Sequence, residues 1–206
     1  MRAYIYVGGE IDPTGITERP AEGDLTVAAD SGWHNAALLK VVPKVLLGDF
    51  DSIGAKNLPD AEEILRVPPE KDNTDTQLAV QLALSRGADE FFIIGGLSGR
   101  LDHTLSNLGV LRDLAARGAH AVMTDGFNRV RFLKNTGVLL ARSDFTYLSL
   151  IAASETVKGV TVKGCKYPLK NARLRQECQY AVSNEIAGNC ALVEVRRGAI
   201  YLIESK

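Results

Sequence analysis

Short apolar runs alternate with segments of helical spacing along the first part of the chain. Runs rich in β-branched and aromatic residues predict strands at residues 4–7, 25–28, 44–47, 64–67, 91–94 and 121–124. Two segments between these runs repeat their apolar residues on one helical face. The first has Leu78 and Leu82 and is followed by Gly87, and the second runs from Leu101 to Ala115 and is followed by Gly118. Strands that alternate with helices predict a mostly parallel sheet with flanking helices.

The pattern changes after about Phe127, where helical spacing gives way to short alternating segments. Residues 145–150, 156–162, 191–195 and 200–203 read as strands with one buried face. Asp125-Gly126 supplies a turn at the change of pattern. We therefore expect an α/β domain over residues 1–126 and a smaller all-β sandwich over residues 127–206.

Composition narrows the class of partner. The chain has 206 residues, 46% of them hydrophobic, a formal net charge of -1 and a pI near 6.3. It has no global basic field that would attract nucleic acid or a membrane, so small molecules are the favoured partners. The three cysteines are too few and too widely spaced for a disulfide framework, and we expect buried free thiols. No signal peptide or membrane span is evident, which favours the cytoplasm.

Acidic residues follow two of the predicted strands, at the edge where open parallel sheets bind ligands. Asp30 follows the second strand, and Gly48-Asp49-Phe50-Asp51-Ser52 follows the third. If this backbone is extended, both carboxylates point to one side and Phe50 to the other. Paired carboxylates suit Mg²⁺, which uses one or two of them together with phosphate oxygens and water. A solvated turn with a capping aspartate explains the same pattern equally well.

Two further loops precede the predicted helices. Lys71-Asp72-Asn73-Thr74-Asp75 supplies ordinary helix-capping residues, and Lys71 adds a positive charge that a phosphate site would use. Gly95-Gly96-Leu97-Ser98-Gly99-Arg100-Leu101-Asp102-His103 is a glycine-rich link from strand to helix. Such a loop lets backbone N–H groups approach a phosphate, although it matches neither a Walker A loop nor GxGxxG.

These motifs resemble those of the thiamine pyrophosphokinase family, in the same order along the chain. The resemblance rests on Gly48–Ser52, on Lys71–Asp75 and on Gly95–His103. It continues into Gly164-Cys165-Lys166-Tyr167-Pro168-Leu169 and Ser183-Asn184-Glu185. One departure is that the family often has Asp-Gly-Gly-Ala-Asn where this chain has Asp30-Ser31-Gly32-Trp33-His34.

The resemblance implies an enzyme that binds ATP and Mg²⁺ in its first domain and forms a homodimer, with thiamine held between domains of different subunits. Asp49, Asp51 and Asp75 would be metal ligands, and Asp75, Arg100 and Asp102 would serve catalysis. The expected nucleotide-binding residues are Asp30, Lys71, Gly96, Gly99 and Arg100. The expected thiamine contacts are Tyr167, whose ring would stack on the substrate, and the pair Ser183 and Asn184.

The implied reaction is attack by the thiamine hydroxyl on the β-phosphorus of ATP, which gives thiamine diphosphate and AMP. Positioning and charge neutralisation would provide most of the rate, and no general base is assigned. Two alternatives use the same residues. A metal-dependent phosphoesterase would activate water with the carboxylates. A non-catalytic thiamine or nucleotide sensor would keep the pockets without the chemistry.

Overall fold

The computed structural model describes residues 1–50, 60–68 and 72–206. These residues form two compact units, Met1–Gly126 and Phe127–Lys206, and the division follows directly after Asp125-Gly126. No helix in the described ranges is long and apolar enough to cross a membrane.

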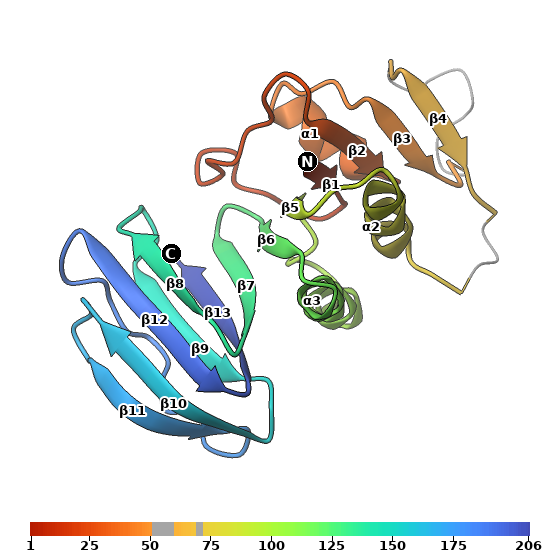
Figure 1. Cartoon of the computed structure of the whole chain (residues 1–206). Helices are drawn as coiled ribbons and strands as arrows, with labels where there is room; N and C mark the ends of the chain where they lie inside the picture. Colours follow the sequence, from red (N-terminus) through yellow and green to blue (C-terminus); the bar gives the residue numbers. More distant parts are fainter. Residues whose placement is uncertain (51–59, 69–71) are drawn as a thin grey trace. The chain divides into compact units, whose positions relative to one another are not determined.

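The first unit contains a parallel sheet (Figure 1). Its strands are β1 (Arg2–Tyr6), β2 (Leu25–Ala29), β3 (Val45–Gly48), β4 (Glu63–Arg66), β5 (Glu90–Ile94) and β6 (His120–Thr124). Within this unit they lie in the order β4-β3-β2-β1-β5-β6, and every neighbouring pair is parallel. The chain runs outward from β1 to β4 and then returns to the other side of β1. The strand order therefore reverses between β1 and β5, which is where open α/β sheets bind ligands.

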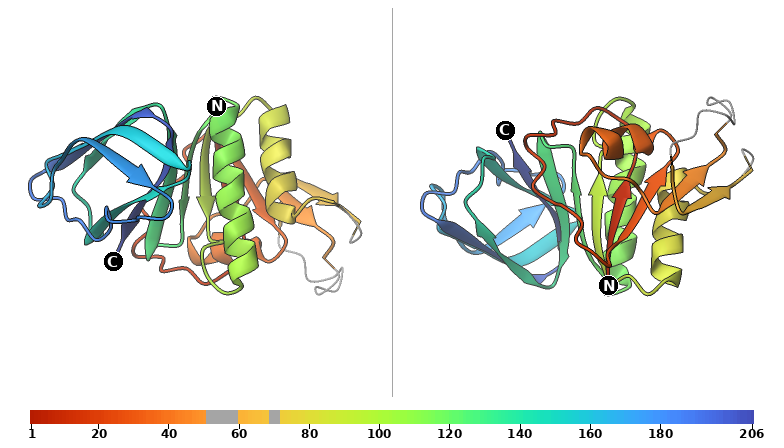
Figure 2. Two further views of the ribbon diagram at one scale, coloured as in Figure 1. Left: turned by 90° about the horizontal axis from the view of Figure 1, so that it is seen from below. Right: turned by 90° about the horizontal axis from the view of Figure 1, so that it is seen from above.

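Helices cover both faces of this sheet. Helix α1 (Gly32–Leu38) lies on one face, and α2 (Asp75–Ser85) and α3 (Leu101–Ala116) lie on the other (Figure 2). The predicted apolar stripe of α3 is wrong in its first half, because Leu101 is 69% exposed and Leu105 is also exposed. Residues Asn107, Val110, Leu111 and Leu114 are buried instead. A polar residue thus occupies one position of the buried face.

The second unit is an all-β sandwich, as expected. One layer contains β7 (Asn128–Lys134), β13 (Ala199–Ser205) and β9 (Tyr147–Ala152). The other has the order β11-β10-β12-β8, made of β8 (Gly137–Ala141), β10 (Thr156–Lys163), β11 (Leu169–Arg175) and β12 (Cys190–Arg197). All pairs within each layer are antiparallel. Buried aliphatic side chains from both layers share one core, including Leu150, Val160 and Leu202.

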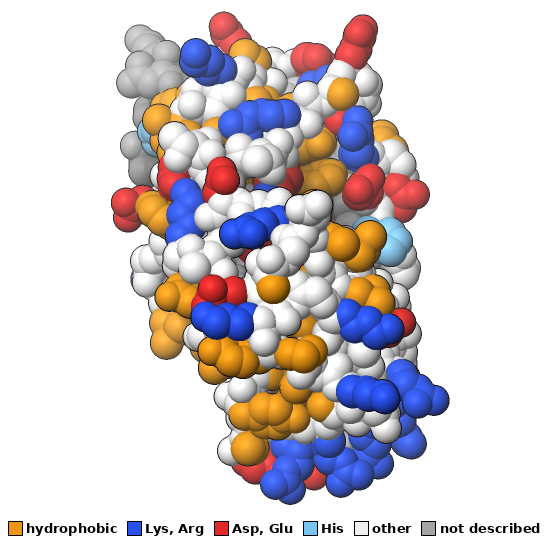
Figure 3. All heavy atoms as spheres, turned by 90° about the vertical axis from the view of Figure 1, so that its left-hand side faces the viewer, with side chains coloured by type: hydrophobic (Ala, Val, Ile, Leu, Met, Phe, Trp, Pro, Cys, Tyr) orange, Lys and Arg blue, Asp and Glu red, His pale blue; other side chains and the backbone are white. Residues whose placement is uncertain are grey.

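Positive charge gathers locally in the second unit even though the net charge of the chain is close to zero. Blue side chains crowd the lower end of the view in Figure 3, which lies in this unit. The register places Lys158 opposite both Arg173 and Arg197 across neighbouring strands. Like charges directly opposite each other destabilise a sheet, so these exposed side chains extend into solvent.

Candidate active site

A pocket of about 450 Å³ lies at the carboxyl edge of the parallel sheet. Its walls come from the loops after β1, β2 and β5 and from the first turns of α2 and α3. The loops after β1 and β5 flank the position where the strand order reverses. The pocket therefore has the position that the topology favours for a ligand.

Glycines allow the two central loops to lie close together. Gly95 has a φ of 98°, and a Cβ added there would be 2.5 Å from the carbonyl oxygen of Val7. Gly96 has a φ of 75°, and a Cβ there would be 2.6 Å from the amide nitrogen of Asn107. Both positions combine a left-handed backbone with a close approach, which explains why this loop needs glycine. Gly96 and Gly99 line the pocket.

Two buried asparagines hold these loops in place. The amide nitrogen of Asn35, on α1, donates to the carbonyl oxygens of Val7 at 2.7 Å and Gly9 at 2.9 Å. The amide nitrogen of Asn107, on α3, donates to the carbonyl oxygen of Gly96 at 2.9 Å. A buried amide is costly unless it is hydrogen-bonded, so each asparagine ties its helix to one loop of the pocket.

The N-termini of α2 and α3 reach the same pocket. Thr74 is the N-cap of α2, and its hydroxyl accepts a hydrogen bond from the backbone N–H of Gln77 at 3.2 Å. The side chain of Gln77 accepts a hydrogen bond in return from the backbone N–H of Thr74 at 2.9 Å. Asp75 is the first residue of α2 and lines the pocket. Helix N-termini attract anions through their partial positive charge, and here two of them converge.

Arg100 lines the pocket, and Asp102 forms an ion pair with it. The guanidinium donates two hydrogen bonds to the carboxylate, from Nε at 3.2 Å and from Nη2 at 2.6 Å. Hydrogen bonding to Arg100 lowers the pKa of Asp102, and the backbone N–H of His103 also donates to its carboxylate. Asp102 is absent from the pocket wall, so it orients Arg100 from outside.

The predicted acidic set is only partly assembled. Asp30 lines the pocket and has a φ of 46°, a left-handed conformation that is unusual outside glycine. The condition that would point both Asp49 and Asp51 to one side, an extended backbone through Phe50, is not met, because Phe50 has a φ of 54°. Asp49 follows β3 outside the pocket wall, and Phe50 is buried in the core of the first unit. Asp51 and Lys71 lie outside the described residues. Within the described ranges, no group of three or more potential metal-binding side chains is found.

The second unit has a small pocket of about 150 Å³. Tyr167 and Asn184, both predicted to contact thiamine, line it, and Ser183 does not. The Tyr167 side chain is exposed, and Lys166 Nζ lies 5.7 Å from the centroid of its ring. Ser183 is exposed with a φ of 57° and its backbone N–H donates to the hydroxyl of Ser149 at 3.0 Å.

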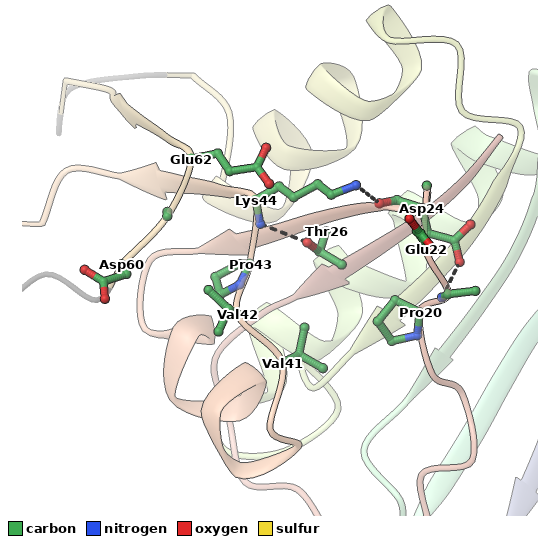
Figure 4. A pocket seen from close by; sticks show the side chains of 13 residues that line it. Pro20, Glu22, Asp24, Thr26, Val41, Val42, Pro43, Lys44, Asp60 and Glu62 are labelled. Atoms are coloured by element: carbon green, nitrogen blue, oxygen red, sulfur yellow. Dashed lines mark hydrogen bonds between the residues drawn. The ribbon is translucent and has the colours of Figure 1, made fainter.

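A further cavity of about 510 Å³ lies at the opposite edge of the parallel sheet (Figure 4). It borders Asp24, Lys44 and Glu62, which directly precede β2, β3 and β4. Lys44 Nζ donates to the carbonyl oxygen of Asp24 at 2.8 Å, and the Asp24 carboxylate pairs with Arg2. The charged groups that border this cavity thus stabilise the edge of the sheet where β2, β3 and β4 begin. The pocket at the carboxyl edge is slightly smaller, but the topology favours it as the ligand site.

Sequence reasoning missed several residues of the pocket. Gly8 and Gly9 after β1 line it, and a Gly-Gly pair directly after a strand is the same signal that drew attention to Gly95 and Gly96. Ser98 accepts a hydrogen bond from the backbone N–H of Glu10 at 2.7 Å and so joins the two loops. In the second unit, Tyr180 was missed because a single tyrosine in a polar segment carries no pattern.

The cysteines differ from the expectation in one respect. All three thiols are free, as expected, but only Cys165 is buried. Burial raises the pKa of the Cys165 thiol. The other two cysteines are exposed, since each lies at the surface of the sandwich near a strand end.

The first unit thus belongs to the open α/β domains that bind a ligand at the reversal of strand order, and a β-sandwich follows it. Two family models match this chain: the thiamin pyrophosphokinase catalytic domain at residues 20–123 and the vitamin B1 binding domain at residues 137–200. The chain belongs to the thiamine pyrophosphokinase family.

Individual relatives agree with this assignment. The chain is 29% identical to thiamine pyrophosphokinase of Bacillus subtilis over 94% of this chain and 92% of the relative. It is also similar to the crystal structure of the Bacillus subtilis protein, with a TM-score of 0.86, 26% identity and coverage of 100% and 99% of the two chains. A family member from Enterococcus faecalis gives a TM-score of 0.85 at 29% identity, with the same coverage.

Proposed function

We propose that this protein transfers the diphosphate group of ATP to the hydroxyl of thiamine and releases AMP. The observation that carries the proposal is the pocket at the reversal of strand order. Two glycine loops and two helix N-termini surround it, and Arg100 is on its wall. Backbone N–H groups and helix ends suit the polyphosphate of a nucleotide. Family membership supplies thiamine as the acceptor.

The chain's own residues position the reacting groups. The loops after β1 and β5 hold the phosphates, and the Arg100 guanidinium neutralises charge that builds up on the transferred group. Asp102 holds that guanidinium in one orientation through two hydrogen bonds. Diphosphate transfer through a loose transition state requires little help from a base, so most of the rate comes from alignment and charge.

Mg²⁺ is part of the proposal. Asp49, Asp51 and Asp75 would hold it, because hard carboxylate oxygens suit this ion and Asp75 stands on the wall of the phosphate pocket. When bound, the ion would neutralise phosphate charge. In the same pocket, Asp30, Lys71, Gly96 and Gly99 would contact the nucleotide.

One assay tests the activity. The protein is incubated with ATP, Mg²⁺ and thiamine, and the nucleotide product is identified. AMP that forms only with thiamine supports diphosphate transfer, whereas ADP would indicate an ordinary kinase. Phosphate release without thiamine would support the metal-dependent phosphoesterase, and thiamine binding without any product would support the sensor.

We also propose a cytoplasmic homodimer with thiamine held between subunits. The aromatic side chains around the small pocket of the second unit are exposed, Tyr167 by 60% and Tyr180 by 52%, as a site completed by another chain would have them. Mixing Tyr167→Ala and Asp75→Asn chains tests this. If each lesion damages a different half of a shared site, random exchange restores roughly a quarter of wild-type activity. Activity equal to the sum of the two separate mutants would exclude a shared site.

A further inference from the structure

Asn184 is buried beside the exposed Tyr167, and its side chain hydrogen-bonds to both backbone groups of that residue. Asn184 is 7% exposed. Its amide oxygen accepts a hydrogen bond from the Tyr167 N–H at 2.9 Å, and its amide nitrogen donates to the Tyr167 carbonyl oxygen at 2.7 Å. The same oxygen also accepts from the Glu185 N–H at 2.9 Å. Both lone pairs of this oxygen are therefore used, so the side chain offers no acceptor to a substrate and has one amide N–H outside these three bonds.

The backbone of Asn184 is tied to the core of the sandwich. Leu148, on β9, donates its N–H to the Asn184 carbonyl at 2.7 Å and accepts the Asn184 N–H at 3.0 Å. Leu148 is itself buried. Asn184 thus connects β9, which ends the strand order of its layer, to the backbone of an exposed tyrosine, and it fixes the place from which the Tyr167 ring projects.

Tyr180 lines the same small pocket as Tyr167. Its hydroxyl donates to the Arg173 carbonyl oxygen at 2.9 Å, which anchors the far end of the ring to β11. Among the described residues, neither tyrosine stacks on another aromatic ring. Aliphatic side chains complete the lining, among them Leu150, Val162 and Leu169.

The size and lining of this pocket fit one flat ring. Its volume is about 150 Å³, and an apolar protein cavity of about 150 Å³ holds one benzene ring. Aromatic faces attract both flat heterocycles and cationic rings. A diphosphate would find no cation inside, since none lines the pocket.

We propose that Tyr167 and Tyr180 are the two walls of a slot for one ring of thiamine, and that Asn184 is a positioning residue that acts through Tyr167. This inference rests on the proposed function and refines its thiamine site. Asn184 changes from an expected substrate contact to the residue that sets the first wall. Tyr180 contacts the substrate through its ring face, while its hydroxyl holds the ring in place by its hydrogen bond to Arg173.

A double-mutant cycle tests the role of Asn184. Wild type, Tyr167→Ala, Asn184→Ala and the double variant are compared by the KM for thiamine, the KM for ATP and the unfolding temperature. Each single change should raise the KM for thiamine by about 3- to 30-fold and leave the KM for ATP unchanged. The double variant should be within about twofold of Tyr167→Ala, because Asn184 has nothing to position once the ring is gone. Multiplying effects would overturn the positioning role, as would an equal rise in both KM values.

Tyr180 gives a second, independent measurement. Tyr180→Leu removes the ring and should raise the KM for thiamine by about 3- to 30-fold. Tyr180→Phe is the matched control, since it keeps the ring and loses only the bond to Arg173, and its KM should change by less than about threefold. An unchanged KM in Tyr180→Leu would overturn the slot.

Calorimetric titration with thiamine separates this inference from the proposed function. If wild type forms no AMP from thiamine, the proposed transfer fails, and the dissociation constants of the same variants still test the slot. If wild type is active and all variants keep its KM and its affinity, the slot alone is wrong. A wild type that neither binds nor converts thiamine would overturn both.

Discussion

Replacing Gly95 by alanine measures how tightly the loop after β5 packs against the loop after β1. An added Cβ would be 2.5 Å from the Val7 carbonyl oxygen and 3.0 Å from that of Gly8, and φ at Gly95 is 98°. Both contacts are with backbone, which cannot rotate away as a side chain can. Gly87, at the end of α2, is the matched control, because its φ is 85° and nothing lies within 4 Å of an added Cβ.

Both substitutions place an alanine in a left-handed backbone, but only one of them also forces the added Cβ against packed backbone atoms. Each pays about 1–2 kcal/mol for an alanine in a left-handed conformation. Only Gly95→Ala must also displace packed backbone, which adds about 1–3 kcal/mol by analogy with overpacking. We therefore expect Gly95→Ala to be less stable than Gly87→Ala by about 1–3 kcal/mol. Its KM for ATP should also rise, because the displaced loops are those of the phosphate pocket.

Urea unfolding followed by tryptophan fluorescence provides the assay. Trp33 is the only tryptophan, and it packs against the core of the first unit, so its emission reports on the unit that carries the change. The difference is taken from the midpoints at equal slope. Equal stabilities for the two variants would show that the loops are looser than the structure indicates.

Three further predictions concern single side chains. Arg100→Lys should lower kcat, since a point charge cannot reproduce a planar guanidinium. The control is Arg117→Lys at the other end of α3, which should leave kcat unchanged. Equal kcat values for the two variants would refute the role of Arg100. Asp75→Asn should lower activity by about 10²-fold or more while the fold survives, as circular dichroism would verify, and an active variant would exclude a metal role. Cys165 should resist a thiol reagent in the native protein while the other two cysteines react, and three fast thiols would contradict its burial.

Periodic patterning predicted the architecture because it records burial. The parallel sheet, the helices α2 and α3 and the all-β character of the second unit follow from apolar spacing. Failures occurred where tertiary context decides. Leu101 and Leu105 fit a helical stripe yet are exposed, because the buried face of α3 is formed by Asn107, Val110, Leu111 and Leu114. The strands β7, β8 and β11 were not predicted. Charged residues interrupt the apolar pattern of β7 and β11, and β8 is a five-residue apolar run without polar alternation.

Residues of the candidate site could be predicted only where the residue type itself, such as glycine or aspartate in a loop after a strand, indicates ligand binding. Glycine-rich and acidic loops after strands drew attention to Asp30, Asp75, Gly96 and Arg100, and the structure brings these four to one pocket. The left-handed backbone at Phe50 was not foreseeable, because a bulky aromatic residue seldom adopts it. Such a conformation depends on the surrounding packing, which holds Phe50 in the core of the unit.

Three buried asparagines explain how the loops that line the pocket of the first unit and the small pocket of the second unit keep their conformation. Asn35, Asn107 and Asn184 are the asparagines that are buried among the described residues. Each donates its amide N–H to a backbone carbonyl of a loop that lines one of the two pockets. Every residue has a backbone carbonyl, so the residue type of the acceptor does not show that an asparagine donates to it. Sequence patterns therefore cannot reveal these hydrogen bonds. A loop that must present glycines or an exposed ring cannot bury apolar surface of its own, and a buried amide supplies the missing constraint at the cost of one desolvated polar group.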